Sequence, residues 1–335
     1  MSRLWKPNSM VLIKTCRRCI SQGSVHLQQA TGAKSTVGGE VFDRRRKRIQ
    51  RDRAASLDDY RTYEYLKEEI GFRVADRIYD IKRYFNVVVD LGCGTGHIAP
   101  HVFKENAGCL IQVDMSEGMI RRAKKSEEVP TCRIIADEEL ALFRPKSVDL
   151  FVSSMSMHWI NDLPGVLKRI HDTLVPDGAL IGAMLGGETL YQLRCSLQLA
   201  ELERLGGLGP HISPFTEIRD IGSLMNRAGF KLLTIDVDEI EVSYPSIFHL
   251  MSDLQDMAEN GAAIRRSTHL HRDVLCAASA IYKEMYGKED GTFPATFQII
   301  YFIGWRAGAT TPKPAKRGSA TASLKDIGKI VEETK

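Results

Sequence analysis

One short segment constrains the fold of this 335-residue chain more than any other. Residues 87–96 read VVVDLGCGTG, so an apolar run is followed at once by three alternating glycines. A run of branched apolar residues predicts a parallel strand that is covered on both faces of its sheet. Glycine permits a tight turn and lets a ligand approach the backbone without meeting a Cβ atom. The segment therefore predicts a ligand-binding loop after a central strand, followed by a helix that begins near His97.

The spacing of the glycines indicates what kind of ligand the loop binds. The dinucleotide motif GxGxxG would need a glycine at position 97, which is His97. The pattern is instead an acid, Asp90, followed by Gly92, Gly94 and Gly96. A carboxylate at that place can orient a ligand ammonium group, which a pyrophosphate ligand does not have. The loop therefore favours a ligand with an amine over a dinucleotide.

Further strands follow the loop at regular intervals. The second strand ends in Asp114 and the third in Asp137. A carboxylate after the second strand of such a sheet typically accepts hydrogen bonds from ribose hydroxyls. Alternating strands and helices predict a doubly wound parallel sheet, with its ligand at the carboxyl ends of the strands. The expected strands are 110–114, 132–137, 147–154 and 176–184, and the expected helices lie around 97–106, 116–126 and 161–174.

Residues 86–185 resemble the core of the class I S-adenosylmethionine (SAM) methyltransferases. The resemblance implies a seven-stranded, doubly wound, Rossmann-like α/β fold that closes with an antiparallel strand. Residues 295–305 suit that strand, and residues 228–236 suit the strand beside it. The expected domain covers residues 42–307 and contains an inserted helical region at 245–290.

The same resemblance implies that SAM is the cofactor and which residues hold it. Asp90 and the three loop glycines (Gly92, Gly94 and Gly96) would hold the methionine end of SAM. Asp114 would bind the ribose, and Asp137 would lie by the adenine.

The composition of the first 39 residues predicts a targeting segment rather than part of the folded domain. They contain six lysines and arginines and no acid, and the basic side chains of a helix at 3–20 would gather on one side. This pattern is typical of a mitochondrial transit peptide, and the alternative is a disordered cytosolic tail. The net charge of +4 is therefore carried by this segment, so composition does not favour a nucleic-acid partner. Residues 308–335 have the composition of a linker and tail.

Residues 42–53 form a second basic segment, FDRRRKRIQRDR. One interpretation is a solvated helical face. The other is a contact surface for an acidic partner or an anionic lipid. No apolar run reaches the roughly 18–20 residues that a membrane span needs.

A closer resemblance lies in segments outside the SAM motif. YLKEE at 65–69, HWINDLP at 158–164, PHISPF at 210–215 and YKEMY at 282–286 are distinctive. Together they are similar to the family of complex I assembly factor 5, over roughly residues 40–330. The resemblance implies a mitochondrial matrix protein, peripheral to the inner membrane. It also implies a hydroxylase of an arginine on an iron–sulfur subunit of the complex's peripheral arm, working with other assembly factors.

Three residues are candidates for chemistry. His158 and Trp159 follow the fourth strand, where an acceptor pocket is expected, as a base and as a surface that stacks on a guanidinium group. The alternative is that Trp159 packs the sheet edge. Glu188 follows the fifth strand and could pair with an arginine substrate, or it could be an ordinary helix N-terminal acid. The glycine-rich run 206–211 is a candidate lid.

Two other functions remain open at this point. The intact SAM motif also suits a methyltransferase that acts on a protein or a small carboxylate. A non-catalytic assembly chaperone would use bound SAM only for structure. Hydroxylation needs an oxidant, but the HxD pattern of His271 and Asp273 lies in a helical pattern, where positions i and i+2 point apart. The sequence therefore predicts no metal site.

Overall fold

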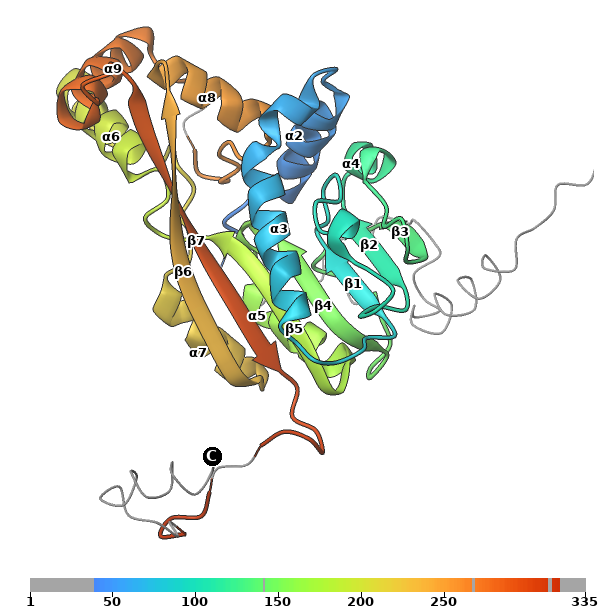
Figure 1. Ribbon diagram of the computed structural model, residues 1–335. Coiled ribbons are helices and arrows are strands. Elements are labelled where there is room, and N and C mark those ends of the chain that lie inside the picture. The colour runs from blue at the N-terminus through green and yellow to red at the C-terminus, as the bar shows by residue number, and fades with distance from the viewer. Residues whose placement is uncertain (1–38, 141, 267–268, 313–314, 320–335) are drawn as a thin grey trace, which may run out of the picture.

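The computed structural model describes residues 39–140, 142–266, 269–312 and 315–319. The predicted transit peptide and most of the predicted tail lie outside these residues. One seven-stranded sheet runs through the molecule in the order β3-β2-β1-β4-β5-β7-β6 (Figure 1). Its strands are β1 Val88–Leu91, β2 Leu110–Asp114, β3 Thr131–Ile135, β4 Val148–Ser154, β5 Leu174–Leu185, β6 Lys231–Tyr244 and β7 Phe293–Trp305.

The pairing confirms the predicted fold class. Strands β1 to β5 all run parallel to one another, whereas β7 runs antiparallel to both β5 and β6. This is the doubly wound α/β sheet with an antiparallel last strand that the resemblance to SAM methyltransferases implies.

Helices cover both faces of the sheet, and others gather beyond one edge (Figure 1). Helix α3 lies on one face, and α5 and α7 lie on the other. Helices α2, α6, α8 and α9 lie toward the end where β6 and β7 extend past the other strands. The α-helices are α2 Arg44–Ser56, α3 Tyr65–Tyr79, α4 Glu117–Arg122, α5 Leu163–Thr173, α6 Tyr191–Leu205, α7 Ile218–Ala228, α8 Ile247–Asp256 and α9 Arg272–Tyr286.

Two hydrophobic clusters hold these layers together, one on each face. Successive side chains of a strand point to opposite faces, so Val88 packs with Ile70 of α3, whereas Val89 packs with Val166 of α5. All of these side chains are buried. The continuous apolar run before the glycine loop is thus explained by burial on both faces.

The expected helix at 97–106 is absent, and that prediction was wrong. Only one 3-10 turn, Ala99–His101, follows the glycine loop. Pro100 has no N–H to donate to a continuing helix, and the backbone is extended at Val102. The chain then returns to the sheet, where Ala107 pairs with Phe85 in an isolated bridge. The loop therefore receives no long-helix N-terminus.

The segment between β6 and β7 carries α8 and α9. Helix α9 packs against α6, and α8 lies beside α2. Within the residues that the structure describes, no helix combines the length and the apolar character that crossing a membrane requires.

Candidate functional site

The glycine loop follows the carboxyl end of β1 and lies against the carboxyl end of β2, where Gly92 N–H donates to the Val113 carbonyl. Gly92, Gly94 and Gly96 all have positive φ, at 73°, 53° and 80°, a conformation that only glycine adopts readily. A Cβ atom at Gly92 would lie 2.0 Å from Ser156 Oγ. The Gly94 N–H donates to Asp114 Oδ2 at 3.0 Å. The loop thus requires its glycines and sits directly on the acid that ends β2.

Asp90 is the least satisfied polar group of the site. It is 1% exposed, and neither carboxylate oxygen has a hydrogen-bond partner in the described part of the chain. Burial, reinforced by the charge of Asp114, raises the pKa of Asp90 to about 8. An unpaired buried carboxyl group is costly, so a ligand that brought a cation or N–H donors to Asp90 would relieve this cost. The methionine ammonium of SAM has that chemistry.

Asp114 already has a partner, and it comes from α2. Arg51 Nη1 lies 3.2 Å from Asp114 Oδ2 and 2.7 Å from Glu138 Oε1. Arg51 Nη2 donates to Ser156 Oγ at 2.9 Å. Arg51 is buried, at 6% exposure. Its guanidinium group therefore fills the space between the ends of β2, β3 and β4, where the ribose was expected.

Arg44 lies about two turns before Arg51 on the same face of α2, and it binds the third acid. Its Nη2 lies 2.7 Å from Asp137 Oδ1 and also pairs with Glu138, while Nη1 donates to the Trp159 carbonyl at 3.2 Å. Burial would raise the pKa of Glu138, but Arg44 and Arg51 outweigh it and lower this pKa to about 2. Glu138 is a site residue that the sequence analysis missed, although an acid next to Asp137 was a visible signal.

These contacts change the interpretation of the basic segment 42–53. Lys47 and Arg51 are buried, and Arg44 is mostly covered, whereas Arg45, Arg46, Arg48 and Arg53 are exposed. The helix is thus neither wholly a solvated face nor wholly a contact surface. Its inner face closes the predicted cofactor site, and only its outer face is available to a partner.

His158 and Trp159 meet an acid from the inserted helical region. Glu259 Oε2 accepts a hydrogen bond from Trp159 Nε1 at 2.9 Å and lies 3.1 Å from His158 Nε2. Lys67 Nζ lies 3.1 Å from Glu259 Oε1. Lys47 Nζ lies over the Trp159 ring, 3.3 Å from its centre. The face of Trp159 that was expected to stack on a guanidinium group is thus covered by an ammonium group of the chain itself.

Glu188 lies apart from this network. It is exposed and lines a cavity of about 690 Å³ together with Phe215 and Glu217. The Phe215 ring centre lies 5.8 Å from that of His158. Phe215 thus stands between the Glu188 cavity and the buried His158. The structure gathers Asp90, Asp114 and Asp137 around α2, but it does not bring Glu188 to them.

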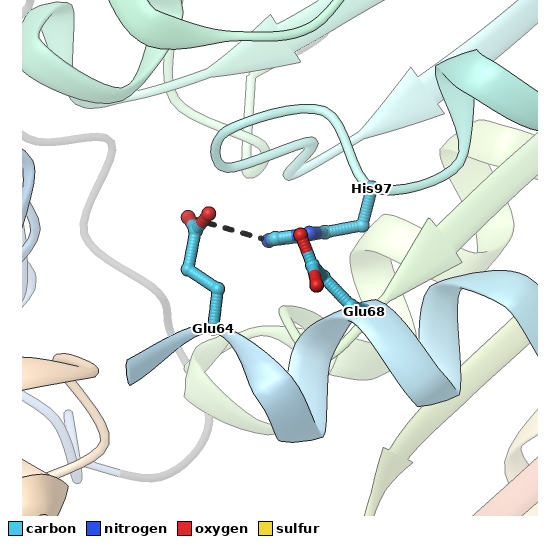
Figure 2. A group of neighbouring side chains, drawn as sticks. All are labelled: Glu64, Glu68 and His97. Atoms are coloured by element: carbon cyan, nitrogen blue, oxygen red, sulfur yellow. Dashed lines mark ion pairs between the residues drawn. The ribbon is translucent and has the colours of Figure 1, made fainter. Parts of the chain in front are cut away.

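One group of side chains near the glycine loop has the composition of a metal site. Within the described ranges, Glu64, Glu68 and His97 place ligand atoms within 4.8 Å of one another (Figure 2). However, Lys124 Nζ lies 2.6 Å from Glu68 Oε1, and Thr95 donates to Glu64. The carboxylates are thus already engaged by the protein. His271 and Asp273, the pair considered from the sequence, are exposed and belong to no such group.

Comparison with known proteins gives a family match to the core of the sheet and relatives that match most of the chain. Residues 89–182 match a family described as "Methyltransferase domain". The chain is 54% identical to "Arginine-hydroxylase NDUFAF5, mitochondrial" of Danio rerio, over 88% of this chain and 92% of that protein. It is 53% identical to the Homo sapiens protein of the same name, over 87% and 84%. It is 29% identical to a "Malonyl-[acyl-carrier protein] O-methyltransferase" of Methylovorus sp., over 83% and 94%.

Proposed function

Because this chain belongs to the arginine-hydroxylase NDUFAF5 family, we propose that it hydroxylates an arginine side chain of another protein. The observation that carries this proposal is the identity of 54% along 88% of the chain, which includes the helical insert and not only the methyltransferase core. The substrate we propose is an iron–sulfur subunit of the peripheral arm of complex I. Other assembly factors of that complex would be its further partners, and nucleic acid would not be one.

The charge of the site supports a guanidinium substrate. Three carboxylates, Asp114, Asp137 and Glu138, bind two guanidinium groups of α2. Carboxylates match the planar donor fork of arginine. The Glu188 cavity carries two acids at its wall, Glu188 and Glu217, beside two arginines, Arg194 and Arg219. The support from charge therefore comes mainly from the carboxylates beneath α2, and the cavity adds two carboxylates that a substrate arginine could pair with.

We also propose that the cofactor is SAM, held as the sequence implies. Asp90 would receive the ammonium group, and Gly92, Gly94 and Gly96 would line the methionine. Asp114 would take the ribose and Asp137 the adenine, once Arg51 and Arg44 leave them. SAM supplies a methyl group on a sulfonium centre, which a hydroxylation does not consume. The unpaired carboxylate of Asp90 is the feature of this site that fits the cofactor best.

The place of action we propose is the mitochondrial matrix, at the inner membrane. The relatives are named mitochondrial, and residues 1–39 carry basic residues without acids. The exposed arginines of α2, Arg45, Arg46, Arg48 and Arg53, give that helix a positive outer face. Such a face favours contact with anionic lipid headgroups, and this supports a peripheral association.

Mass spectrometry of the iron–sulfur subunit, with and without this protein, tests the proposal. The expected result is a gain of one oxygen on an arginine, which is lost in an Asp90→Ala variant and kept in an Asp220→Asn control on the exposed face of α7. A gain of one methylene unit, with S-adenosylhomocysteine formed in equal amount, would make the protein a methyltransferase. If the peptide mass stays unchanged while assembly still needs the protein, a chaperone function would replace the proposal.

A further inference from the structure

Glu259 is delivered to the centre of the molecule by a strained turn. Helix α8 ends at Asp256, and Ala258 then adopts a left-handed conformation with φ at 61°. For a residue with a Cβ atom this conformation is unfavourable. The Glu259 N–H donates back to the Leu254 carbonyl at 2.8 Å. The turn thereby directs Glu259 inward, and the strain is maintained by contacts that the turn makes elsewhere.

Two lysines hold the turn in place, the buried Lys47 and the partly buried Lys67. Lys67 of α3 donates to the Met257 carbonyl at 2.6 Å and pairs with Glu259 Oε1 at 3.1 Å. Lys47 of α2 donates to the Ala258 and Asn260 carbonyls at 2.9 and 3.1 Å. Each carbonyl from Met257 to Asn260, other than that of Glu259 itself, therefore accepts a hydrogen bond from a lysine Nζ. Such a clamp fixes one carboxylate with little freedom to move.

This carboxylate decides which nitrogen of His158 carries the proton. Burial would raise the pKa of Glu259, but Lys67 and the hydrogen bond from His158 outweigh it, so this pKa lies well below its ordinary value. Burial also lowers the pKa of His158, against the opposing effect of Glu259. An anionic Glu259 accepts, so the neutral imidazole must donate through Nε2. The lone pair of His158 then lies on Nδ1.

His158 Nδ1 is an acceptor that the described protein leaves unused. It is buried and has no hydrogen-bond partner among the described residues. A guanidinium group offers five N–H donors and no acceptor, so it complements this atom. The arrangement of carboxylate, imidazole and free nitrogen follows the logic by which a third group orients a catalytic histidine.

We infer that Glu259 is a positioning residue that presents His158 Nδ1 as the hydrogen-bond acceptor for the guanidinium group of the substrate arginine. This inference rests on the proposed function and names the recognition contact of that site. The substrate would reach Nδ1 from the Glu188 cavity by displacing the half-buried Phe215, whose ring lies 5.8 Å from that of His158. Trp159, tied to the same carboxylate, would keep the imidazole plane fixed.

Two substitutions of His158 separate recognition from folding. In His158→Gln the side-chain amide reaches Glu259 in place of Nε2, so the carboxylate keeps a donor while the acceptor at Nδ1 is lost. In His158→Asn the amide oxygen approximates Nδ1, while the contact to Glu259 is lost. A fluorescent arginine peptide from the iron–sulfur subunit serves as the probe, and its lysine counterpart measures selectivity. The matched control is His249→Gln, at an exposed histidine of α8.

The expected result is that His158→Gln keeps a melting temperature near that of the wild type but binds the arginine peptide at least tenfold more weakly. Its preference over the lysine peptide should shrink, whereas His158→Asn should retain more of that preference at lower stability. Binding of His158→Gln within twofold of the wild type would overturn the inference alone. A wild type that binds neither peptide would overturn the docking contact together with the proposed function.

A second measurement does not depend on activity. Nitrogen NMR of histidine-labelled protein reports which ring nitrogen of His158 carries the proton. The charged groups that act on this ring are Glu259, Lys47 and Arg51, and Lys67 binds the other oxygen of Glu259. We expect Nδ1 to be unprotonated in the wild type at pH 7. A Glu259→Gln variant should show protonation divided between the two nitrogens, because its amide can also donate. A wild-type imidazole protonated at Nδ1 would contradict the positioning role.

Discussion

Arg51 Nη1 lies 3.2 Å from Asp114 Oδ2, so a side chain of α2 holds the carboxylate that we propose as the ribose ligand. Both residues are buried, and the same guanidinium group also binds Glu138. A ligand that donates hydrogen bonds to Asp114 therefore competes with a residue of the protein itself. The affinity for the proposed cofactor thus depends on the difference between two free energies, that of SAM binding to Asp114 and that of Arg51 binding to it.

Replacing Arg51 tests this competition. Arg51→Met removes the ion pair of buried Asp114 and one of the two ion pairs of Glu138, which keeps Arg44. This loss is expected to lower the free energy of unfolding by roughly 3–5 kcal/mol. Since SAM no longer has to displace the guanidinium group, the rise in melting temperature on adding SAM should exceed that of the wild type. Thermal unfolding with and without SAM measures both effects, and Arg45→Met, on the exposed face of α2, is the control. A smaller SAM-induced rise than in the wild type would show that Arg51 contacts the cofactor instead.

Asp90 is predicted to lower the stability of the folded protein while strengthening cofactor binding. Its folded pKa of about 8 lies above the unfolded value of 3.8, so between these pH values the folded protein keeps a proton that the unfolded chain has lost. Wild-type stability from this group therefore falls as pH rises through that window. Asp90→Asn should be more stable than the wild type at pH 8, by roughly 1–3 kcal/mol. Urea unfolding at pH 5 and pH 8 measures the difference.

The same variant should bind SAM more weakly. Loss of a hydrogen bond to a charged group costs about 1.5–3 kcal/mol, which corresponds to roughly 10- to 100-fold in affinity. Calorimetric titration with SAM gives this number. Unchanged SAM affinity in Asp90→Asn would place the ammonium group of the cofactor away from Asp90.

Acid should destabilise the protein through its buried histidines. Burial, with Lys67 and Lys124 nearby, lowers the pKa of His97 to about 3 from the ordinary 6.5. Below pH 6.5 the unfolded chain binds a proton that the folded state excludes, so stability falls as pH falls toward 3. Each such group contributes a slope of about 1.4 kcal/mol per pH unit in this window. His97→Gln should show a shallower loss between pH 6 and pH 4.5, whereas His249→Gln should follow the wild type.

Glu188 is expected to affect substrate binding without affecting folding. The side chain is exposed, so Glu188→Gln should change the free energy of unfolding by less than about 0.5 kcal/mol. If the cavity receives the substrate arginine, KM for the peptide should rise several-fold, and the effect should shrink at high salt. Glu284→Gln, an exposed acid on α9, is the control. Equal KM values for the two variants would remove Glu188 from the site.

The sequence predicts the sheet well because its signals are local. The apolar run at β1, the glycines after it and the strand-terminal Asp114 need no knowledge of distant residues, and each lies where it was expected. The prediction of a helix after the loop was wrong for a local reason as well, since Pro100 and the extended Val102 limit this segment to one turn. The antiparallel last strand followed from the resemblance and not from any residue alone.

The site was less predictable because its contacts join distant segments. Glu259 meets His158 across 101 positions of the chain, and no periodicity links them. In α2 the inward face consists of Lys47, Gln50, Arg51 and two alanines, so the usual apolar stripe that marks a buried face is missing. A sequence of charged residues predicts an exposed helix unless the carboxylates that neutralise it are known. Those carboxylates lie at the ends of β2 and β3.

Arg44, Lys47 and Arg51 follow one another at intervals of three and four, and so they project from one face of α2. Two of them bind the acids of the cofactor pocket, and the third clamps the turn that carries Glu259. A rigid helix cannot release one set of contacts without disturbing the other. Occupancy of the two pockets is therefore energetically linked, and the factor by which SAM changes peptide affinity must equal the factor by which peptide changes SAM affinity. Helix α2 is therefore the element that couples the two pockets, whichever ligand binds first.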